Sequence, residues 1–180
     1  EELTRFVVTF LRSEAVGADC LRLLVPLVEA AERGDADSAS PRLEALPGQV
    51  KRLVTVFLEQ IDPRHMDPNA WLDHIQRPYV WGVVDAQTGL RHEGPSGMQL
   101  GVMSLLNSLL DVQSHSALAQ SIRSSWTLLL PEQRRFLEAC EACRPVLRRF
   151  VSAPGRRRLR SAFNATLDQL AAWRRCHQSR

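Results

Sequence analysis

Residues 155–180, GRRRLRSAFNATLDQLAAWRRCHQSR, form the stretch around which the rest of the chain is organised. Side chains spaced by three and four residues lie on one face of an α-helix. In this stretch that face consists of Leu159, Phe163, Leu167, Leu170, Arg174 and His177. The spacing predicts a long helix that begins after Pro154 and buries this face in the core of the protein.

Two of the six positions on this face, Arg174 and His177, are polar. An imidazole that points into an apolar cleft is a suitable axial ligand for a haem iron. A guanidinium one turn earlier is placed to pair with an anionic haem propionate at the edge of the cleft. The alternative is an ordinary hydrogen-bonded core histidine, which is the more common role of a single histidine on an apolar face.

Helical spacing also dominates most of the remaining chain. It predicts one or two helices over residues 3–33, a helix most clearly over residues 50–61, and further helices from Ser96 onward. An amphipathic segment over residues 115–129 is expected to end before Pro131, and Pro131 and Pro145 are each expected to begin a helix. The polar, turn-rich residues 34–41, GDADSASP, predict a loop.

Residues 62–95 are the least helical part of the sequence. Asp67 is a suitable cap for a short helix that begins at Pro68 and runs to about Gln76. Because a residue before proline is disfavoured in the helical region, Arg77 is expected at a helix end or bend. Residues 79–95 are expected to be irregular, with a short hairpin around Thr88 and Gly89. Strand signals are otherwise nearly absent, so the predicted class is all-α, with residues 1–180 in a single helical domain.

Composition excludes several classes of protein. No apolar run approaches the ~20 residues that a membrane span requires. The formal net charge of +3 comes almost wholly from arginine, since Lys51 is the only lysine. Arginine clusters at residues 156–158 and 174–175 accompany no recognisable nucleic-acid motif. We therefore expect neither a membrane nor a nucleic acid as partner.

The four cysteines do not form a disulfide framework for a chain of this length. Cys140 and Cys143 form a C-x-x-C pair, but on an expected helix and without a second such pair. A zinc site is therefore not expected, and a reducing, cytoplasmic setting fits the cysteine usage best.

Five segments, in the same order over nearly the whole chain, resemble the indoleamine 2,3-dioxygenase family of haem proteins. The LLPEQRRFL segment (residues 129–137) is similar to the family's Met-Pro-Pro-x-His-Arg-x-Phe-Leu. The RPVLRRFV segment (144–151) is similar to its Pro-x-Val-Arg-x-Phe-Val, and the last helix is similar to the family's helix that ends in Leu-Arg-x-x-His. GPSGMQ (94–99) resembles its Gly-Gly-Ser-Ala-Gly-Gln loop. DPNAWLDHIQRPYVWG (67–82) resembles its Asp-Pro helix and Arg-Pro-Phe-Leu-x-Gly. The opening helix, with Phe6 and Glu14, resembles the family's substrate-facing helix.

This resemblance implies the helical, haem-binding large domain of the family and its reaction. The cofactor would be haem b and the co-substrate O₂, which is inserted across the indole C2–C3 bond of tryptophan or a related indole to give an N-formylkynurenine-type product. His177 would be the proximal ligand of the iron, and Arg174 the partner of a propionate. Arg77 would bind the substrate carboxylate and Phe6 would contact the indole ring. Ser96 and Gly97 would form a small-residue loop over the haem.

Several positions depart from the family pattern. Asn107 stands where the family usually has an aspartate near the haem-edge arginine, and Phe10 where a small residue often lies. Pro95 replaces a glycine in the haem loop. The segment from Asp67 to Arg77 is one residue longer than usual, so Gln76 or His74 are alternatives to Arg77 as the residue that faces the pocket. A further alternative is that Arg77 pairs with Asp73 one helical turn earlier.

The sequence leaves two other functions open. One is a divergent haem oxygenase acting on another aromatic amino acid, and the other is a catalytically silent helical haem-binding or interaction module. Family enzymes have a substantial region before the helix that contains Phe6, and the chain begins without it. Besides a small aromatic substrate, the partners left open are a complementing N-terminal chain or domain and a second copy of this chain.

Overall fold

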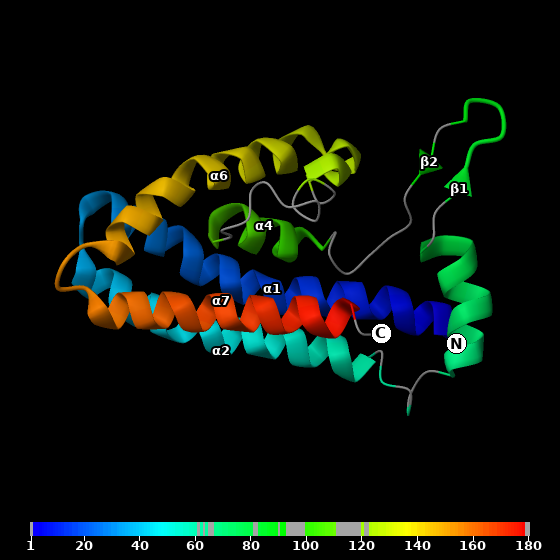
Figure 1. Cartoon of the computed structure of the whole chain (residues 1–180), viewed down its shortest axis with the longest axis horizontal. Coiled ribbons are helices and arrows are strands. Elements are labelled where there is room, and N and C mark those ends of the chain that lie inside the picture. Colours follow the sequence, from blue (N-terminus) through cyan, green and yellow to red (C-terminus); the bar gives the residue numbers. More distant parts are fainter. Residues whose placement is uncertain are drawn as a thin grey trace.

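A computed structural model describes residues 2–60, 62, 64, 67–80, 83–89, 91–92, 100–110, 120 and 123–178. For residues 2, 60, 78–80, 83, 91–92, 128 and 176–178 it describes the backbone alone. Three long helices lie side by side: α1 (Glu2–Arg33), α2 (Ala36–Gln60) and α7 (Arg157–Gln178). Helix α6 (Pro131–Ser152) runs across them, and the short helix α4 (Gly101–Leu110) lies between α6 and α1 (Figure 1). The predicted all-α class is confirmed.

Helix α1 is a single helix, in which Gly17 and Pro26 cause no break. Its buried side includes Cys20, Leu24, Leu27 and Ala31. It ends in a Schellman-type turn, because the amide of Gly34 donates to the carbonyl of Ala31 and that of Asp35 to Ala30. Gly34 has a φ of 73°, a left-handed conformation that glycine adopts without strain.

The loop predicted over residues 34–41 is wrong. Only Gly34 and Asp35 separate α1 from α2, because the Asp35 carboxylate accepts the backbone amide of Ser38 at 3.0 Å and caps α2. Hydrogen bonds from Ser38 hold the pKa of Asp35 below its usual value. Pro41 and Pro47 lie inside the helix. It persists through them because a continuous buried line runs along it: Ala39, Leu43, Leu46, Val50, Leu53 and Phe57.

The region around Arg77 is more helical than the sequence suggests. Asp67 caps α3 (Pro68–Trp71) as predicted, with its side chain accepting the Asn69 amide at 2.9 Å. The chain then continues as a π-helix, η1 (Leu72–Val80), so the predicted helix end or bend at Arg77 is wrong. A proline in an α-helix clashes with the carbonyl four residues earlier, and the wider turn of a π-helix relieves that clash at Pro78.

The predicted hairpin around Thr88 and Gly89 is confirmed. Strands β1 (Val83–Val84) and β2 (Arg91–His92) pair antiparallel, with Val83 opposite His92. The Asp85 carboxylate accepts the amides of Gln87 and Thr88 in the turn, and these bonds lower the pKa of Asp85. Among the described residues these two short strands form the only sheet.

Helix α4, in the region from Ser96 onward where helices were predicted, buries Met103, Leu106 and Leu110, and Leu100 just before it is also buried. Residues 115–119, 121 and 122 of the predicted segment 115–129 lie outside the described residues, and the end of the segment includes the 3₁₀ turn η3 (Ser125–Leu128). Pro131 begins α6 as expected. Pro145 does not begin a helix, since α6 runs unbroken to Ser152 with Leu147 and Phe150 buried beyond the proline. In the described part of the chain, no helix is both long and apolar enough to span a membrane.

Candidate functional site

The end of α7 carries the predicted haem residues. The buried side chains Leu159, Phe163, Thr166, Leu170 and Trp173 follow a repeat of four and three residues along this helix. One further step of four along that line reaches His177, which lies within the helix, although its side chain is outside the described part. Trp173 is fully buried against Phe57 of α2, with ring centroids 4.3 Å apart. The helix is thus fixed by close packing one turn before His177.

Arg174 contacts Asn107, 67 residues away in the sequence. Its Nη2 donates to Oδ1 of Asn107 at 2.6 Å, which joins α7 to α4. Asn107 is only 7% exposed, and its Nδ2 is buried with no hydrogen-bond acceptor among the described residues. The structure therefore brings a predicted cofactor residue against the position where the sequence departs from the family pattern.

Helix α4 is held at both ends by charged side chains. At its start, the Glu14 carboxylate of α1 accepts the amides of Gly101 and Val102, the latter at 3.2 Å. At its end, Arg144 and Arg148 of α6 donate to the carbonyls of Ser108 and Leu110, at 2.6 and 2.8 Å. An anion at the start and cations at the end both stabilise the helix dipole. These contacts fix the helix that carries Asn107.

The predicted indole contact, Phe6, is 8% exposed and belongs to an aromatic cluster. Its ring lies edge-on to Phe10, with centroids 4.8 Å apart, and to Trp71 of α3, at 5.4 Å. Such pairs are favourable arrangements of aromatic rings. Sequence reasoning did not assign Trp71 to the site, although the Asp67 cap that positions its short helix was visible in the sequence.

Arg77 lies at the surface of η1. Its Nη1 donates to Asp73 at 3.0 Å, with the two side chains 57% and 55% exposed. The alternative pairing considered for Arg77 is therefore present. Among the other candidates, Gln76 is half-buried and His74 is exposed, whereas Ile75 anchors the helix in the core. Ser96 and Gly97 lie outside the described residues.

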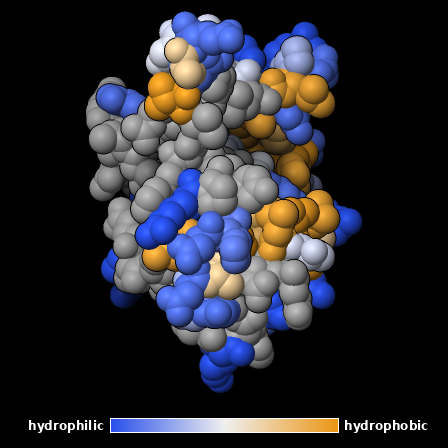
Figure 2. All heavy atoms as spheres, turned by 90° about the vertical axis from the view of Figure 1, so that its right-hand side faces the viewer, coloured by the Kyte–Doolittle hydropathy of each residue, from blue (hydrophilic) through white to orange (hydrophobic). Residues whose placement is uncertain are grey.

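The end of the molecule that holds η1 and the start of α1 also exposes apolar side chains. Leu3, Val7 and Leu11 recur at four-residue steps on α1 and are each at least 45% exposed. Figure 2 faces the end that holds η1 and the start of α1, and it shows separate apolar patches between hydrophilic ones.

Comparison with protein families matches the chain to the model described as Indoleamine 2,3-dioxygenase, over residues 1–179. The chain belongs to the indoleamine 2,3-dioxygenase family. Comparison with curated proteins gave no match. The match covers the elements described above from α1 to the end of α7.

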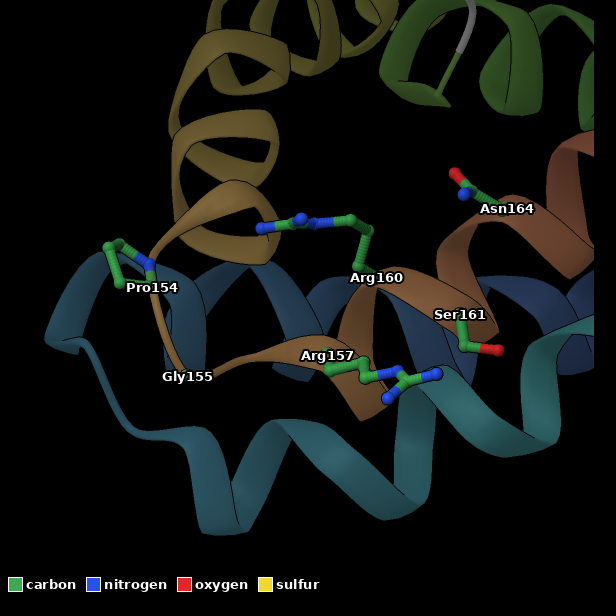
Figure 3. A pocket seen from close by; sticks show the side chains of 6 residues that line it. All are labelled: Pro154, Gly155, Arg157, Arg160, Ser161 and Asn164. Atoms are coloured by element: carbon green, nitrogen blue, oxygen red, sulfur yellow. The ribbon is translucent and has the colours of Figure 1, made fainter.

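A cavity of about 580 Å³ lies at the opposite end of α7 from the family's expected haem site. It is lined by Pro154, Gly155, Arg157, Arg160, Ser161 and Asn164 (Figure 3). At 1.5 Å per residue, Asn164 is roughly 20 Å from His177 along the helix. Arg160 donates to the carbonyl of Ser152 at 2.7 Å, so it stabilises the turn between α6 and α7.

The described thiols are positioned for packing. Burial raises the pKa of Cys20 and that of Cys140 to about 11, with smaller effects of Asp19 and Cys143 respectively. Cys140 and Cys143 are one turn apart on α6, as the sequence indicates. Within the described residues, no three His, Cys, Asp or Glu side chains are grouped to hold a metal ion. Haem iron needs only one axial ligand from the protein, so such a group is not required.

Proposed function

We propose that this member of the indoleamine 2,3-dioxygenase family is a haem-dependent dioxygenase. Its substrate would be tryptophan or a related indole, and its product an N-formylkynurenine-type compound. When bound, haem b would supply the activation of O₂ for insertion across the indole C2–C3 bond. The observation that carries this proposal is the contact between Arg174 and a buried amide, one helical turn before His177.

The described residues fit the anionic edge of a haem. Arg174 provides a cationic donor, and the buried Nδ2 of Asn107 is a donor that lacks an acceptor among the described residues. A propionate carboxylate has acceptor sites for both groups. His177 would hold the iron, with the orientation of its helix fixed by Trp173.

On the substrate side, Phe6 would contact the indole ring, with Trp71 supporting Phe6. Ser96 and Gly97 would leave room for the ligand above the haem. Arg77 would bind the substrate carboxylate. Its exposed pairing with Asp73 is worth roughly 0.2–1 kcal/mol, and a charge-assisted hydrogen bond to substrate roughly 1.5–3 kcal/mol. A bound carboxylate would replace Asp73 as the partner of this guanidinium.

Haem binding to a His177→Ala variant tests the proposal. The purified chain is titrated with haem and the Soret band is recorded. We expect the variant to lose stoichiometric haem while its circular dichroism stays helical, since its fold rests on packing elsewhere along α7. His74→Ala is the matched control, because His74 is exposed on η1. Unchanged haem binding in His177→Ala would remove this histidine as ligand. The alternatives are His65, His74, His92 and His115; the control already tests His74, and the other three would be tested next.

Product analysis separates the remaining functions. Incubation of the haem-loaded chain with tryptophan, O₂ and a reductant that keeps the iron ferrous should give an N-formylkynurenine-type absorbance. Haem binding with turnover of a different aromatic amino acid would indicate a divergent oxygenase. A chain that binds haem and oxidises none of these substrates would be a silent module.

A further inference from the structure

Helix α4 has no N-terminal cap from its own sequence. The carbonyl of Leu100 accepts the amide of Ser104 at 2.9 Å, so Leu100 occupies the cap position before the first helical turn. Its apolar side chain is buried and has no oxygen that could accept the amides of that turn. With ten residues, α4 is also shorter than the about 12–15 residues that an isolated helix needs to be stable in water. Contacts from other elements must therefore hold its start.

Two residues of α1, one turn apart, meet the start of α4. The Glu14 carboxylate accepts the amides of Gly101 and Val102, which a local cap would otherwise bond. A side chain at residue 17 would overlap Val102, so Gly17 lets the two helices approach closely enough for these bonds. The charge is favourable as well, because an anion stabilises the positive end of the helix dipole. Glu14 thus supplies, from 87 residues away, the cap that the local sequence lacks.

Helix α4 connects the two sides of the candidate site. Glu14 lies about two turns after Phe6, the proposed indole contact, on the same helix. Further along α4, Asn107 accepts the hydrogen bond of Arg174 on α7 at 2.6 Å. A displacement of α4 would therefore break the contact between Asn107 and the helix that carries the proposed haem ligand.

We propose that Glu14 is a positioning residue of the candidate site. Its carboxylate caps α4 from α1 and so holds in place the helix that contacts Arg174. This inference rests on the proposed function, because it gives Glu14 a role in haem binding that is exerted through α4. A carboxylate with this role is replaceable by another carboxylate at the same end of the helix.

The structure offers a position for that second carboxylate. A Cβ at Gly101 would lie 3.3 Å from Oε1 of Glu14, and its three nearest neighbours all belong to the Glu14 carboxylate group. The variant Glu14→Ala would free this space. Gly101→Asp would then place a carboxylate in the first turn of α4, where acidic residues stabilise a helix. With Glu14 present, the same substitution would instead bring two carboxylates together.

Four proteins test the proposal: the unmodified chain, Glu14→Ala, Gly101→Asp and the double variant. Hydrogen exchange of α4, with α2 as the internal reference, measures how often α4 opens. The Soret band in a haem titration measures the affinity for haem. Glu14→Ala should increase the exchange of α4 by about 2- to 30-fold, as expected for loss of a helix cap. Both single variants should bind haem at least about 2-fold more weakly, because less of the chain has α4 in place.

The double variant is the decisive protein. It should restore slow exchange of α4 and most of the affinity for haem, so Gly101→Asp should be harmful with Glu14 and beneficial without it. Glu29→Ala is the matched control, because it removes an exposed carboxylate of the same helix, for which the described residues show no hydrogen bond or ion pair. The control should leave exchange and haem affinity unchanged.

Four outcomes would overturn or narrow the roles assigned to Glu14 and haem. Unchanged exchange of α4 in Glu14→Ala would show that Glu14 does not hold this helix. Faster exchange with unchanged haem affinity would make Glu14 a structural cap alone and overturn its positioning role. Slow exchange but weak haem binding in the double variant would show that Glu14 does not act through α4. If the unmodified chain bound no haem, the proposed function would fail, and exchange of α4 would still decide whether Glu14 holds the helix.

Discussion

Helices α2 and α4 both contribute to the core, but they bury different kinds of side chain. Every buried side chain described on α2 is apolar, and one line of them extends to Phe57 against Trp173. Helix α4 buries three polar side chains, Ser104, Asn107 and Ser108, within ten residues. Apolar burial stabilises both helices, but α4 also buries polar groups, and charged side chains hold its two ends.

The difference separates stability from function within one core. Buried polar groups cost free energy unless they are satisfied, so they are poor choices for stability alone. Three of the six described in this chain lie on α4, the helix that contacts Arg174 at the proposed haem edge. The predictions below test this division, beginning with the α2 and α7 side.

Trp173→Ala should have the largest effect on stability. Removal of a fully buried tryptophan leaves a cavity between α2 and α7, for which losses of about 3–5 kcal/mol are usual. Urea denaturation followed by circular dichroism measures the loss. Trp71→Ala is the matched control and should cost less, because Trp71 is only half-buried. Equal losses for the two variants would show that the α2–α7 contact is not the main source of stability.

Gly17→Ala tests how closely α1 and α4 approach. A Cβ at residue 17 would lie 2.5 Å from the Cβ of Val102, so either helix must shift, at a cost of about 1–3 kcal/mol. Gly48→Ala is the control on α2, where an added Cβ meets nothing within 4 Å. That variant should gain about 0.5–1 kcal/mol from helix propensity. Thermal unfolding of the two variants should therefore change in opposite directions, and a stabilised Gly17→Ala would contradict the close approach.

The dependence of stability on alkaline pH should be a smaller effect. The pKa of Cys20 is about 11 in the folded chain against an ordinary 9.0, so its contribution is complete below pH 9 and is lost between pH 9 and 11. Cys140, whose pKa is also raised to about 11, adds a similar dependence in both proteins, whereas the chain has only one lysine and one tyrosine. Urea midpoints at pH 8, 9 and 10 should fall less steeply for Cys20→Ala than for the unmodified chain. Parallel slopes would mean that the thiol ionises equally in both states.

The sequence could predict the local features of the fold but not those that depend on distant contacts. The Asp67 cap and the Asp85 turn were predictable because their hydrogen bonds span two or three residues. The start of α2 was mistaken for a loop because Pro41 and its polar neighbours favour a turn, and only packing of Leu43 and Leu46 overrides them.

The candidate site follows the same rule. Spacing predicted the helix α7 and the burial of Leu159, Phe163 and Leu170, since these belong to one helix. It did not place Thr166 and Trp173 on the buried face, where they lie, whereas Leu167 and Arg174 are only half-buried. The bond from Arg174 to Asn107 joins residues 67 positions apart, so no local pattern contains it. Family resemblance drew attention to Asn107, and the unsatisfied Nδ2 appears only in three dimensions.

Arg77→Leu should have the smallest effect on stability and a selective effect on binding. Arg77 is exposed, whereas Arg174 is half-buried. Its pair with Asp73 is more than half exposed at both ends, so the free energy of unfolding should change by less than about 1 kcal/mol. If Arg77 binds the substrate carboxylate, affinity for tryptophan should fall about 10- to 150-fold while affinity for indole, which lacks that group, stays the same. Asp73→Asn is the matched control: it removes the competing carboxylate and should strengthen tryptophan binding slightly. Equal losses for tryptophan and indole in Arg77→Leu would assign Arg77 to the structure of η1, and Gln76 and His74 would become the candidates for the anchor.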